Sequence, residues 1–385
     1  MAKNRYALVL SGGGFKGAFQ YGALKYIKGF GIPHADGTVD LDVKFDIVAG
    51  VSVGALNGAL IAMDRFDLLE MFWDDVSKKG HAEIYTSDIL TVNDNPNGTE
   101  IKPDFGAVLK KLIPGSIFGK IIEAIFDSES VIDEVGANFK KIKGLADNTP
   151  MLNKLKNVVS KNNFPQGVTY RCGLVSLTDG EYHSLGPEDF STDLDLQLAI
   201  VASTAIPIVW PPVPKIKTTT KGTLKNLVDG GVRNNSPLGD VIDLIKQKEQ
   251  PDDVWHIVVI NCNSVQLDTA DIEYGVADVA LRAANDLMPN EIFRSDMSEF
   301  LRINELVNQV EKAKLLGTIP NTFSLQSGGH NLKSYNIKVI EPTNIQDVGS
   351  TLDSSRKAIR KRFDAGFRKA DAVFKAIPTD EQPWT

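Results

Sequence analysis

The sequence predicts an α/β fold in which helices cover a mostly parallel sheet. A short apolar run, a glycine-rich turn and a stretch with helical spacing follow one another twice, at residues 6–30 and 45–63. Further apolar runs of strand length come later in the chain. Because parallel strands need a crossover connection, usually a helix, this alternation is typical of a parallel sheet between helices. With 385 residues, of which 42% are hydrophobic, the chain can build a large core.

The individual elements are expected in the following order. A strand at residues 6–10 runs into a glycine loop at 11–17, and a helix follows to about residue 30. The next strand, 45–48, meets a second sharp turn before a helix of small residues that ends near residue 63. The later elements are strands at 168–177 and 181–185 around the turn Asp179-Gly180, a helix near 193–203, and strands at 254–261 and 334–340.

Two regions depart from this alternation. Residues of about 80–166 are rich in loops and then in helical spacing, which predicts a largely helical inserted cap. Its apolar residues 117–126 are expected to form a lid, a channel wall or simply a packed helix. At the other end, about 351–375 reads as an amphipathic helix. Its apolar face carries Ile359, Phe363, Phe367 and Phe374, and its basic side carries Arg356, Lys357, Arg360, Lys361, Arg362, Arg368 and Lys369.

Composition and charge exclude several classes of protein. The 42 Lys and Arg against 49 Asp and Glu give a net charge of −7, which offers no general attraction for nucleic acid or anionic membranes. No apolar run approaches the roughly 18 residues of a membrane span, and no leader is expected. Cys172 and Cys262 lie in apolar runs without disulfide or metal-ligand spacing. A cytoplasmic protein with at most local, peripheral membrane contact is the simplest expectation.

The first motif is the glycine loop Gly12-Gly13-Gly14-Phe15-Lys16-Gly17. Its spacing matches the dinucleotide-binding pattern G-x-G-x-x-G between a strand and a helix. However, no acidic residue closes the second strand to hold a ribose, and no G-K-[ST] follows to make a phosphate loop. Backbone N–H groups at a helix N-terminus can still turn toward a negative charge. A tight turn without chemistry is the plainer alternative.

The second motif is Gly50-Val51-Ser52-Val53-Gly54, a G-x-S-x-G sequence between a strand and a helix. A nucleophile on such a turn has a strained backbone, and glycines flank it because the chain packs closely on both sides. A serine with a purely structural role is the alternative.

The third motif is Asp229-Gly230-Gly231, which follows the apolar pair Leu227-Val228 and precedes Pro237, a residue suited to the first turn of a helix. An aspartate beside two glycines at a strand end is often only a turn former. Taken alone, this motif therefore does not distinguish a catalytic carboxylate from a turn.

In their order and wording, these three motifs resemble the patatin-like phospholipases, a family of lipid acyl hydrolases. The segment Ala202-Ser203-Thr204-Ala205-Ile206-Pro207 adds to the resemblance, which covers about residues 6–245. That range would be the catalytic core containing the 80–166 insertion, and 246–385 would complete the same α/β body. The resemblance implies a three-layer sandwich with helices on both faces of the sheet. Lys16 stands where the family often has arginine, which keeps the charge but loses the bidentate fork.

The resemblance also implies a role for each motif. Ser52 would be the nucleophile and Asp229 its base, while Gly50 and Gly54 would form the nucleophile elbow and Gly230 and Gly231 the turn that supports the dyad. The oxyanion hole would be the loop Gly12, Gly13, Gly14, Phe15, Lys16 and Gly17, acting chiefly through the N–H groups of Gly13 and Gly14. Such a Ser/Asp dyad requires no metal and no organic cofactor.

The expected activity is therefore hydrolysis of fatty-acyl esters of membrane phospholipids or lysophospholipids. A histidine-dependent α/β-hydrolase esterase or acyltransferase is the rival enzyme class, but the five histidines are scattered and none stands beside a motif. A nucleotide-binding protein and a non-catalytic lipid-binding protein are rivals of another class. Because an uncontrolled lipase is hazardous to a cell, we also expect the insertion or the region after Gln250 to hold the enzyme inactive until a ligand, partner or membrane arrives.

Overall fold

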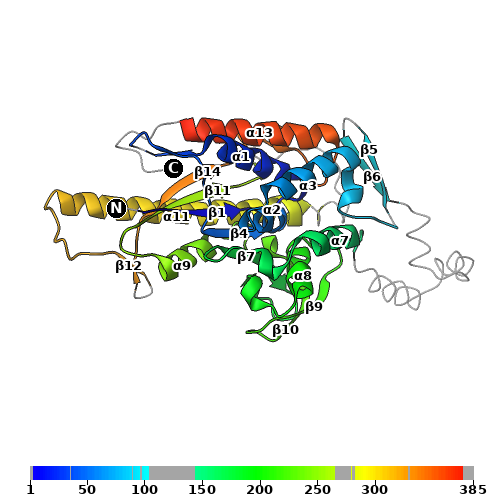
Figure 1. Ribbon diagram of the computed structural model, residues 1–385, viewed down its shortest axis with the longest axis horizontal. Helices are drawn as coiled ribbons and strands as arrows, with labels where there is room; N and C mark the ends of the chain where they lie inside the picture. The colour runs from blue at the N-terminus through cyan, green and yellow to red at the C-terminus, as the bar shows by residue number, and fades with distance from the viewer. Residues whose placement is uncertain are drawn as a thin grey trace, which may run out of the picture.

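The computed structural model describes residues 3–34, 36–88, 90–95, 98–103, 144–264, 279, 282–327 and 330–375. The apolar residues 117–126, expected in the inserted cap, lie outside these ranges. The body is an eight-stranded sheet with the strand order β14-β11-β1-β4-β7-β10-β9, in which β8 also pairs with β7 (Figure 1). Its strands are β1 (Lys3–Leu10), β4 (Ile47–Val51), β7 (Thr169–Ser176), β8 (Tyr182–Leu185), β9 (Val213–Lys217), β10 (Thr223–Asp229), β11 (Asp253–Ile260) and β14 (Asn336–Ile340).

The predicted mostly parallel sheet is confirmed. The neighbours from β14 through β11, β1 and β4 to β7 all run parallel, and β8, β9 and β10 join by antiparallel pairing. In β1, Ala7 and Val9 pack on one face and Leu8 and Leu10 on the other, and all four are fully buried. A strand buried on both faces reads as a continuous apolar run, which is why it is visible in the sequence.

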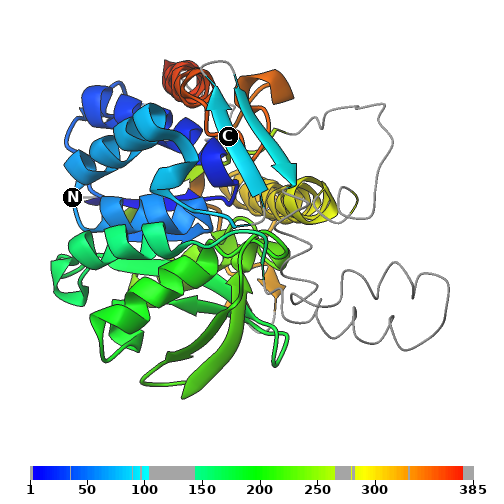
Figure 2. The same ribbon diagram turned by 90° about the vertical axis from the view of Figure 1, so that its right-hand side faces the viewer.

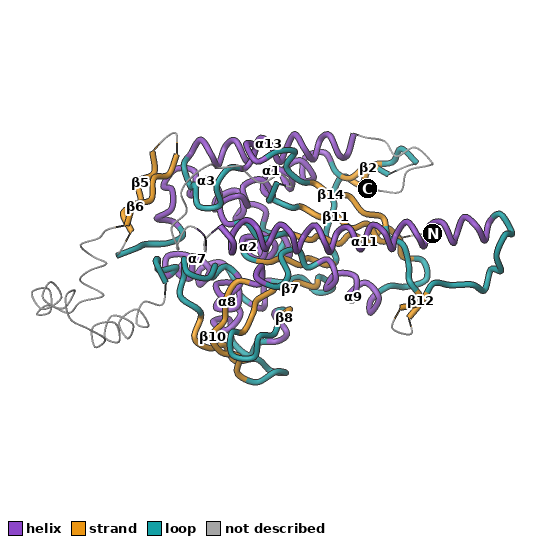
Figure 3. The backbone as a smooth tube through the Cα atoms, turned by 180° about the vertical axis from the view of Figure 1, so that it is seen from behind, coloured by secondary structure: helices purple, strands orange, loops and turns teal. Residues whose placement is uncertain are grey.

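Helices cover both faces, so the predicted three-layer sandwich is also confirmed. One face carries α1 (Gly17–Phe30), α2 (Val53–Ala62), α3 (Phe66–Lys79) and α13 (Arg356–Lys375), with α7 (Thr149–Val158) and α8 (Asp193–Ser203) in the same core. The other face packs against α9 (Leu238–Lys248) and the long α11 (Met288–Leu315), which crosses the sheet in the view from behind (Figure 3).

Smaller elements decorate this body. They are β2 (Ile32–Pro33), β3 (Val39–Asp40), β5 (Leu90–Asn95), β6 (Gly98–Pro103), β12 (Gln326–Ser327), β13 (His330–Asn331), α12 (Ile345–Val348), short 3-10 helices at Gly14–Lys16, Gly80–Glu83, Lys161–Asn163, Pro187–Asp189 and Gly230–Val232, and a π-helical turn at Ala283–Leu287. The β5–β6 hairpin stands beside the start of α13 (Figure 2), where Asp94 accepts a hydrogen bond from the Ser354 hydroxyl at 2.6 Å. No helix in the described part of the chain is long and apolar enough to cross a membrane.

Some element boundaries differ from the prediction. The strand predicted at residues 45–48 is β4, Ile47–Val51. It continues through Gly50 because both of its edges are paired, one with β1 and the other with β7. Glycine is depleted in strands, so the prediction assigned Gly50 to the turn instead of to the strand. The last helix begins at Arg356 rather than near 351, because Ser355 caps it by accepting a hydrogen bond from the N–H of Ala358 at 3.3 Å.

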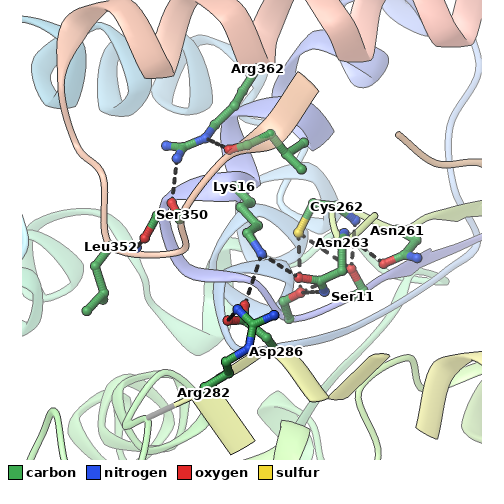
Figure 4. A network of polar contacts seen from close by, with 12 residues as sticks. Ser11, Lys16, Asn261, Cys262, Asn263, Arg282, Asp286, Ser350, Leu352 and Arg362 are labelled. Carbon is green, nitrogen blue, oxygen red and sulfur yellow. Dashed lines mark hydrogen bonds and ion pairs between the residues drawn. The ribbon is translucent and has the colours of Figure 1, made fainter. Parts of the chain in front are cut away.

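The apolar face of α13 packs on α1 as expected, with Phe367 and Phe374 against Tyr26. The prediction that Arg362 lies on the solvated basic side is wrong. Its side chain is only 1% exposed, because the guanidinium donates hydrogen bonds to the carbonyls of Val348, Ser350 and Asp353 (Figure 4). Helical spacing locates a residue on a helix face but gives no information on acceptors supplied by a neighbouring loop.

Candidate active site

Ser52 occupies the turn between β4 and α2. Its backbone has φ 56° and ψ −129°, a conformation that a non-glycine residue adopts only at an energetic cost. The side chain is 4% exposed, and the Ser52 N–H donates to the Oγ of Ser203 at 2.9 Å. The serine is thus presented on a strained, anchored turn at the carboxyl end of a central strand.

The two glycines of the motif are required by space. A Cβ on Gly50 would overlap the carbonyl oxygen of Gly54, and a Cβ on Gly54 would overlap the carbonyl oxygen of Leu10 in β1. Because backbone atoms cannot move aside as a flexible side chain can, any larger residue here would displace the turn that carries Ser52.

Asp229 ends β10 and faces Ser52. Its N–H donates to the Ala205 carbonyl at 3.0 Å, and its carboxylate accepts the Gly231 N–H at 2.7 Å. Burial raises the pKa of Asp229 to about 7, while hydrogen bonds from the Ser52 side chain and the Gly231 N–H act in the opposite direction. Gly230 lies against the backbone of Gly173, where a Cβ would come within 2.5 Å of the Gly173 carbonyl oxygen. The structure therefore places Ser52 and the buried carboxyl group of Asp229 on the wall of one cavity, where the Ser52 side chain acts to lower the pKa of that carboxyl group.

The glycine loop leaves two amides available. The N–H of Gly12 donates to the Asn235 carbonyl, that of Phe15 to the Thr351 carbonyl, and that of Lys16 to the Gly13 carbonyl. Gly17 donates back into the loop. Within the described ranges, the N–H groups of Gly13 and Gly14 have no partner. Both glycines have positive φ, 159° and 56°, of which the second favours glycine strongly.

The residues of the predicted oxyanion loop therefore fall into two groups. Gly13 and Gly14 can offer N–H donors, whereas the N–H groups of Gly12, Phe15, Lys16 and Gly17 are occupied in shaping the loop. The Lys16 side chain points into a buried polar network with Asn263 and Asp286 (Figure 4). Its Nζ lies 3.3 Å from Asn263 Oδ1 and 3.6 Å from Asp286, and burial lowers its pKa while Asp286 raises it.

Two cavities meet at Ser52. The first holds about 470 Å³ of empty space, and its wall is almost wholly apolar, with contributions from Leu56, Phe72, Ile206 and Trp210. The second holds about 350 Å³ and is lined by Gly12, Gly13 and Asp229 together with polar side chains that include Asn235, Asn263 and Thr351. An ester carbonyl at Ser52 could thus place an apolar chain on one side and a polar group on the other.

Asn235, Asn263 and Thr351 also line the second cavity, although no sequence motif predicts a role for them. Asn263 Nδ2 donates to the Gly12 carbonyl at 2.6 Å, and Thr351 braces the loop through its carbonyl. Asn235 is 2% exposed, and its Nδ2 has no partner within the described part of the chain. Asn235 lies four residues after Gly231 of the Asp229-Gly230-Gly231 motif, so its position could have suggested it. Asn263 and Thr351 are far from every motif in sequence and carry no such signal.

The four histidines whose side chains the structure describes lie elsewhere. His34 and His256 are beside Tyr6 at the start of the sheet, His81 pairs with Asp94, and His183 is on β8. None of these four lines either cavity at Ser52. The described residues also contain no group of three or more His, Cys, Asp or Glu side chains that could hold a metal ion.

An α/β sandwich with a strained serine turn beside amides that face no partner is an arrangement typical of acyl hydrolases. The comparison with protein families gives the class a name. The model of the patatin-like phospholipases matches residues 8–242, more than half of the chain, so this protein belongs to that family. It is accordingly a lipid acyl hydrolase.

Two other comparisons add little. Among solved structures, the crystal structure of VipD from Legionella pneumophila matches with 14% sequence identity and a TM-score of 0.32. The match covers 96% of this chain and 67% of that one. No curated protein matches the sequence.

Proposed function

We propose that this protein is a serine phospholipase A or lysophospholipase that cleaves fatty-acyl esters through Ser52 and Asp229. The observation that carries the proposal is that Ser52 and the buried Asp229 line one cavity, together with Gly12 and Gly13, and that Ser52 also opens onto an apolar cavity. A dyad of this kind combines nucleophile and base without histidine.

The chemistry follows from these positions. The Ser52 oxygen attacks the ester carbonyl carbon while its proton passes to the Asp229 carboxylate. A carboxylate whose pKa is about 7 is a better base near neutral pH than an ordinary aspartate, so its burial assists this transfer. The carbonyl oxygen becomes an oxyanion, and the N–H groups of Gly13 and Gly14 are the donors proposed to stabilise it. Such donors are typically worth about 3 kcal/mol each.

The tetrahedral intermediate then breaks the bond between the carbonyl carbon and the alcohol oxygen. The departing lysolipid or alcohol takes the proton from Asp229, which leaves an acyl ester on Ser52. Asp229 next removes a proton from water as the water attacks the acyl carbon. Cleavage of the acyl–serine bond releases the fatty acid and returns the proton to Ser52, so the dyad is restored.

The substrates proposed are phospholipids or lysophospholipids of a membrane that the protein contacts peripherally from the cytoplasm. The apolar first cavity would take part of the acyl chain, and the second would take the ester and the polar backbone of the lipid. We further propose that the enzyme is held inactive until a ligand or protein partner binds. That activator would act through the inserted segment or the region after Gln250.

The test is mass spectrometry of lipids released from mixed phospholipid and lysophospholipid vesicles. Wild type should release fatty acid, whereas Ser52→Ala and Asp229→Asn should each lose at least about a thousandfold in rate. Ser324→Ala and Asp243→Asn on the surface are matched controls that should retain it. Full hydrolysis by Ser52→Ala would refute the dyad.

The same assay separates the rival functions. Loss of hydrolysis in a His256→Asn, His330→Asn double variant that still folds would favour a histidine-dependent esterase. Binding of NAD or ATP without labelling of Ser52 by a fluorophosphonate would favour a nucleotide-binding protein. Silence on every lipid ester, with lipid still bound, would favour a non-catalytic lipid-binding protein.

A further inference from the structure

A third cavity lies beyond the apolar cavity at Ser52, between α2, α3 and α7. It spans about 610 Å³, part of which is open to solvent, and it shares three lining residues with the first cavity, namely Leu56, Phe72 and Met151. Leu56 and Met151 are buried, and Phe72 is half-buried. These three side chains therefore form the junction between the two apolar spaces.

The two cavities follow one face of α2. Leu56 and Leu60 are spaced four residues apart in α2, so their side chains lie above one another on the same side of the helix, and Ser52 is the residue that precedes its first turn. Leu56 lines both cavities, and Leu60 lines only the distal one. At a rise of 1.5 Å per residue, Leu56 is about 6 Å from Ser52 along the axis, and Leu60 is about 12 Å away.

The character of the wall changes along this path. Leu60 and Leu155 are almost fully buried in the distal cavity. At its outer end, Met71 is 60% exposed, and Lys154 and Asp75 form an ion pair at 3.4 Å. An apolar interior that ends at the surface beside a charged pair is suited to an alkyl chain, because it offers no polar partner until the chain reaches solvent.

We propose that the distal cavity is the outer half of the acyl-chain site and that its depth, from the junction at Phe72 and Met151 past Leu60 to Met71, determines chain-length specificity. The inference rests on the proposed function of Ser52. An extended chain of single bonds advances about 1.2 Å per bond, as the reach of an extended polypeptide shows. About five carbons of an acyl chain fit between Ser52 and Leu56, and about ten reach Leu60. Acyl chains of about ten carbons or more fill both cavities, and the surplus leaves past Met71.

The experiment measures the rate at which Ser52 is labelled by fluorophosphonates with a short or a long alkyl chain. Leu60→Trp fills the distal cavity, so the ratio of the long-chain to the short-chain rate should fall at least tenfold. Leu177→Trp is the matched control, since Leu177 is exposed and lines neither cavity, and its ratio should equal that of wild type. The same ratio is measured with esters of short and long fatty acids.

A second variant decides the matter if Leu60→Trp lacks a cooperative melting transition. Met71→Trp changes an exposed position at the outer end of the path, and it should lower the rate only with chains long enough to pass that point. An unchanged ratio in a folded Leu60→Trp protein overturns the inference. If Leu60→Trp does not fold, an unchanged ratio in Met71→Trp overturns it instead. In either case, continued labelling of Ser52 leaves the proposed function standing. Undiminished ester hydrolysis by Ser52→Ala overturns both.

Discussion

Ser203 and Ser52 are joined by a hydrogen bond that anchors the turn between β4 and α2. The Ser203 hydroxyl accepts the Ser52 N–H at 2.9 Å and itself donates to the carbonyl of Gly173 in β7. Two residues further on, the carbonyl of Ala205 accepts the N–H of Asp229. The end of α8 therefore holds both members of the pair, although neither Ser203 nor Ala205 contributes a reacting atom.

Replacing Ser203 by alanine should loosen this arrangement. The Ser52 N–H and the Gly173 carbonyl would both lose a buried partner, at a cost of about 1–3 kcal/mol each. We expect kcat to fall by about 10- to 100-fold with little change in KM, because a small misplacement of reacting groups is costly. Steady-state kinetics and a thermal melt measure this. Ser160→Ala removes a comparable hydroxyl that accepts a backbone N–H at the surface, and it should leave kcat unchanged.

The rate should depend on pH through Asp229. A protonated carboxyl cannot accept the proton of Ser52, and the pKa of Asp229 is raised to about 7 by burial. The value of kcat/KM should therefore rise about tenfold per pH unit below 7 and level off above about 8. A profile that is flat from about pH 5 to pH 8 would contradict the assignment of Asp229 as the base.

The same pKa predicts a change in stability. Asp229 binds a proton more tightly in the folded protein than in the unfolded chain, so the free energy of unfolding falls as pH rises from about 4 to about 7. Asp229→Asn removes the ionisable group. Its melting temperature relative to wild type should rise between about pH 5 and pH 8, and an unchanged difference would show that the carboxyl titrates normally.

Arg362 should support the glycine loop from a distance. Its guanidinium holds the carbonyls of Val348, Ser350 and Asp353, and the Thr351 carbonyl between them accepts the N–H of Phe15. Arg362→Gln should lower both the melting temperature and kcat, since the buried carbonyls lose their donors. Arg360→Gln is the matched control, because Arg360 lies two residues earlier in α13 and is exposed. Equal activity of the two variants would show that the 348–353 segment does not affect the loop.

Two glycines should be essential to the contact of α1 with α13. A Cβ on Gly22 would overlap the carbonyl of Phe363, and one on Gly366 would overlap the carbonyl of Phe19. Gly22→Ala should therefore lower the melting temperature by several degrees or prevent folding. Gly29→Ala on the same helix meets nothing within 4 Å and should be neutral or stabilising by about 0.5–1 kcal/mol. A thermal melt of the two variants distinguishes the effects.

Local signals were enough to predict the sheet and the helices that cover it. β1 and the two glycine turns were visible because buried parallel strands are continuous apolar runs and because tight turns need glycine. The helix predicted near 193–203 is α8, and in the structure Thr192 caps its start by accepting the N–H of Asp195 with its hydroxyl.

Features that depend on long-range contacts could not be predicted in the same way. The burial of Arg362 requires carbonyls from a loop that the helix spacing does not reveal. Which N–H groups of Gly12–Gly17 have a partner likewise depends on distant residues, since the carbonyls of Asn235 and Thr351 accept those of Gly12 and Phe15. Nothing in a single sequence specifies which distant carbonyl will approach an N–H, because that is decided by the packing of the complete domain.

The bracing of the Phe15 amide by Thr351 links residues from opposite ends of the sequence. A ribosome releases the amino end first, at about 5–20 residues per second, so the turn that carries Ser52 emerges well before α13. A nascent chain that already carries Ser52 and Asp229 still lacks the carbonyl that orders the amides beside them. The order of synthesis would then keep the growing chain inactive toward lipids until α13 has packed against the domain.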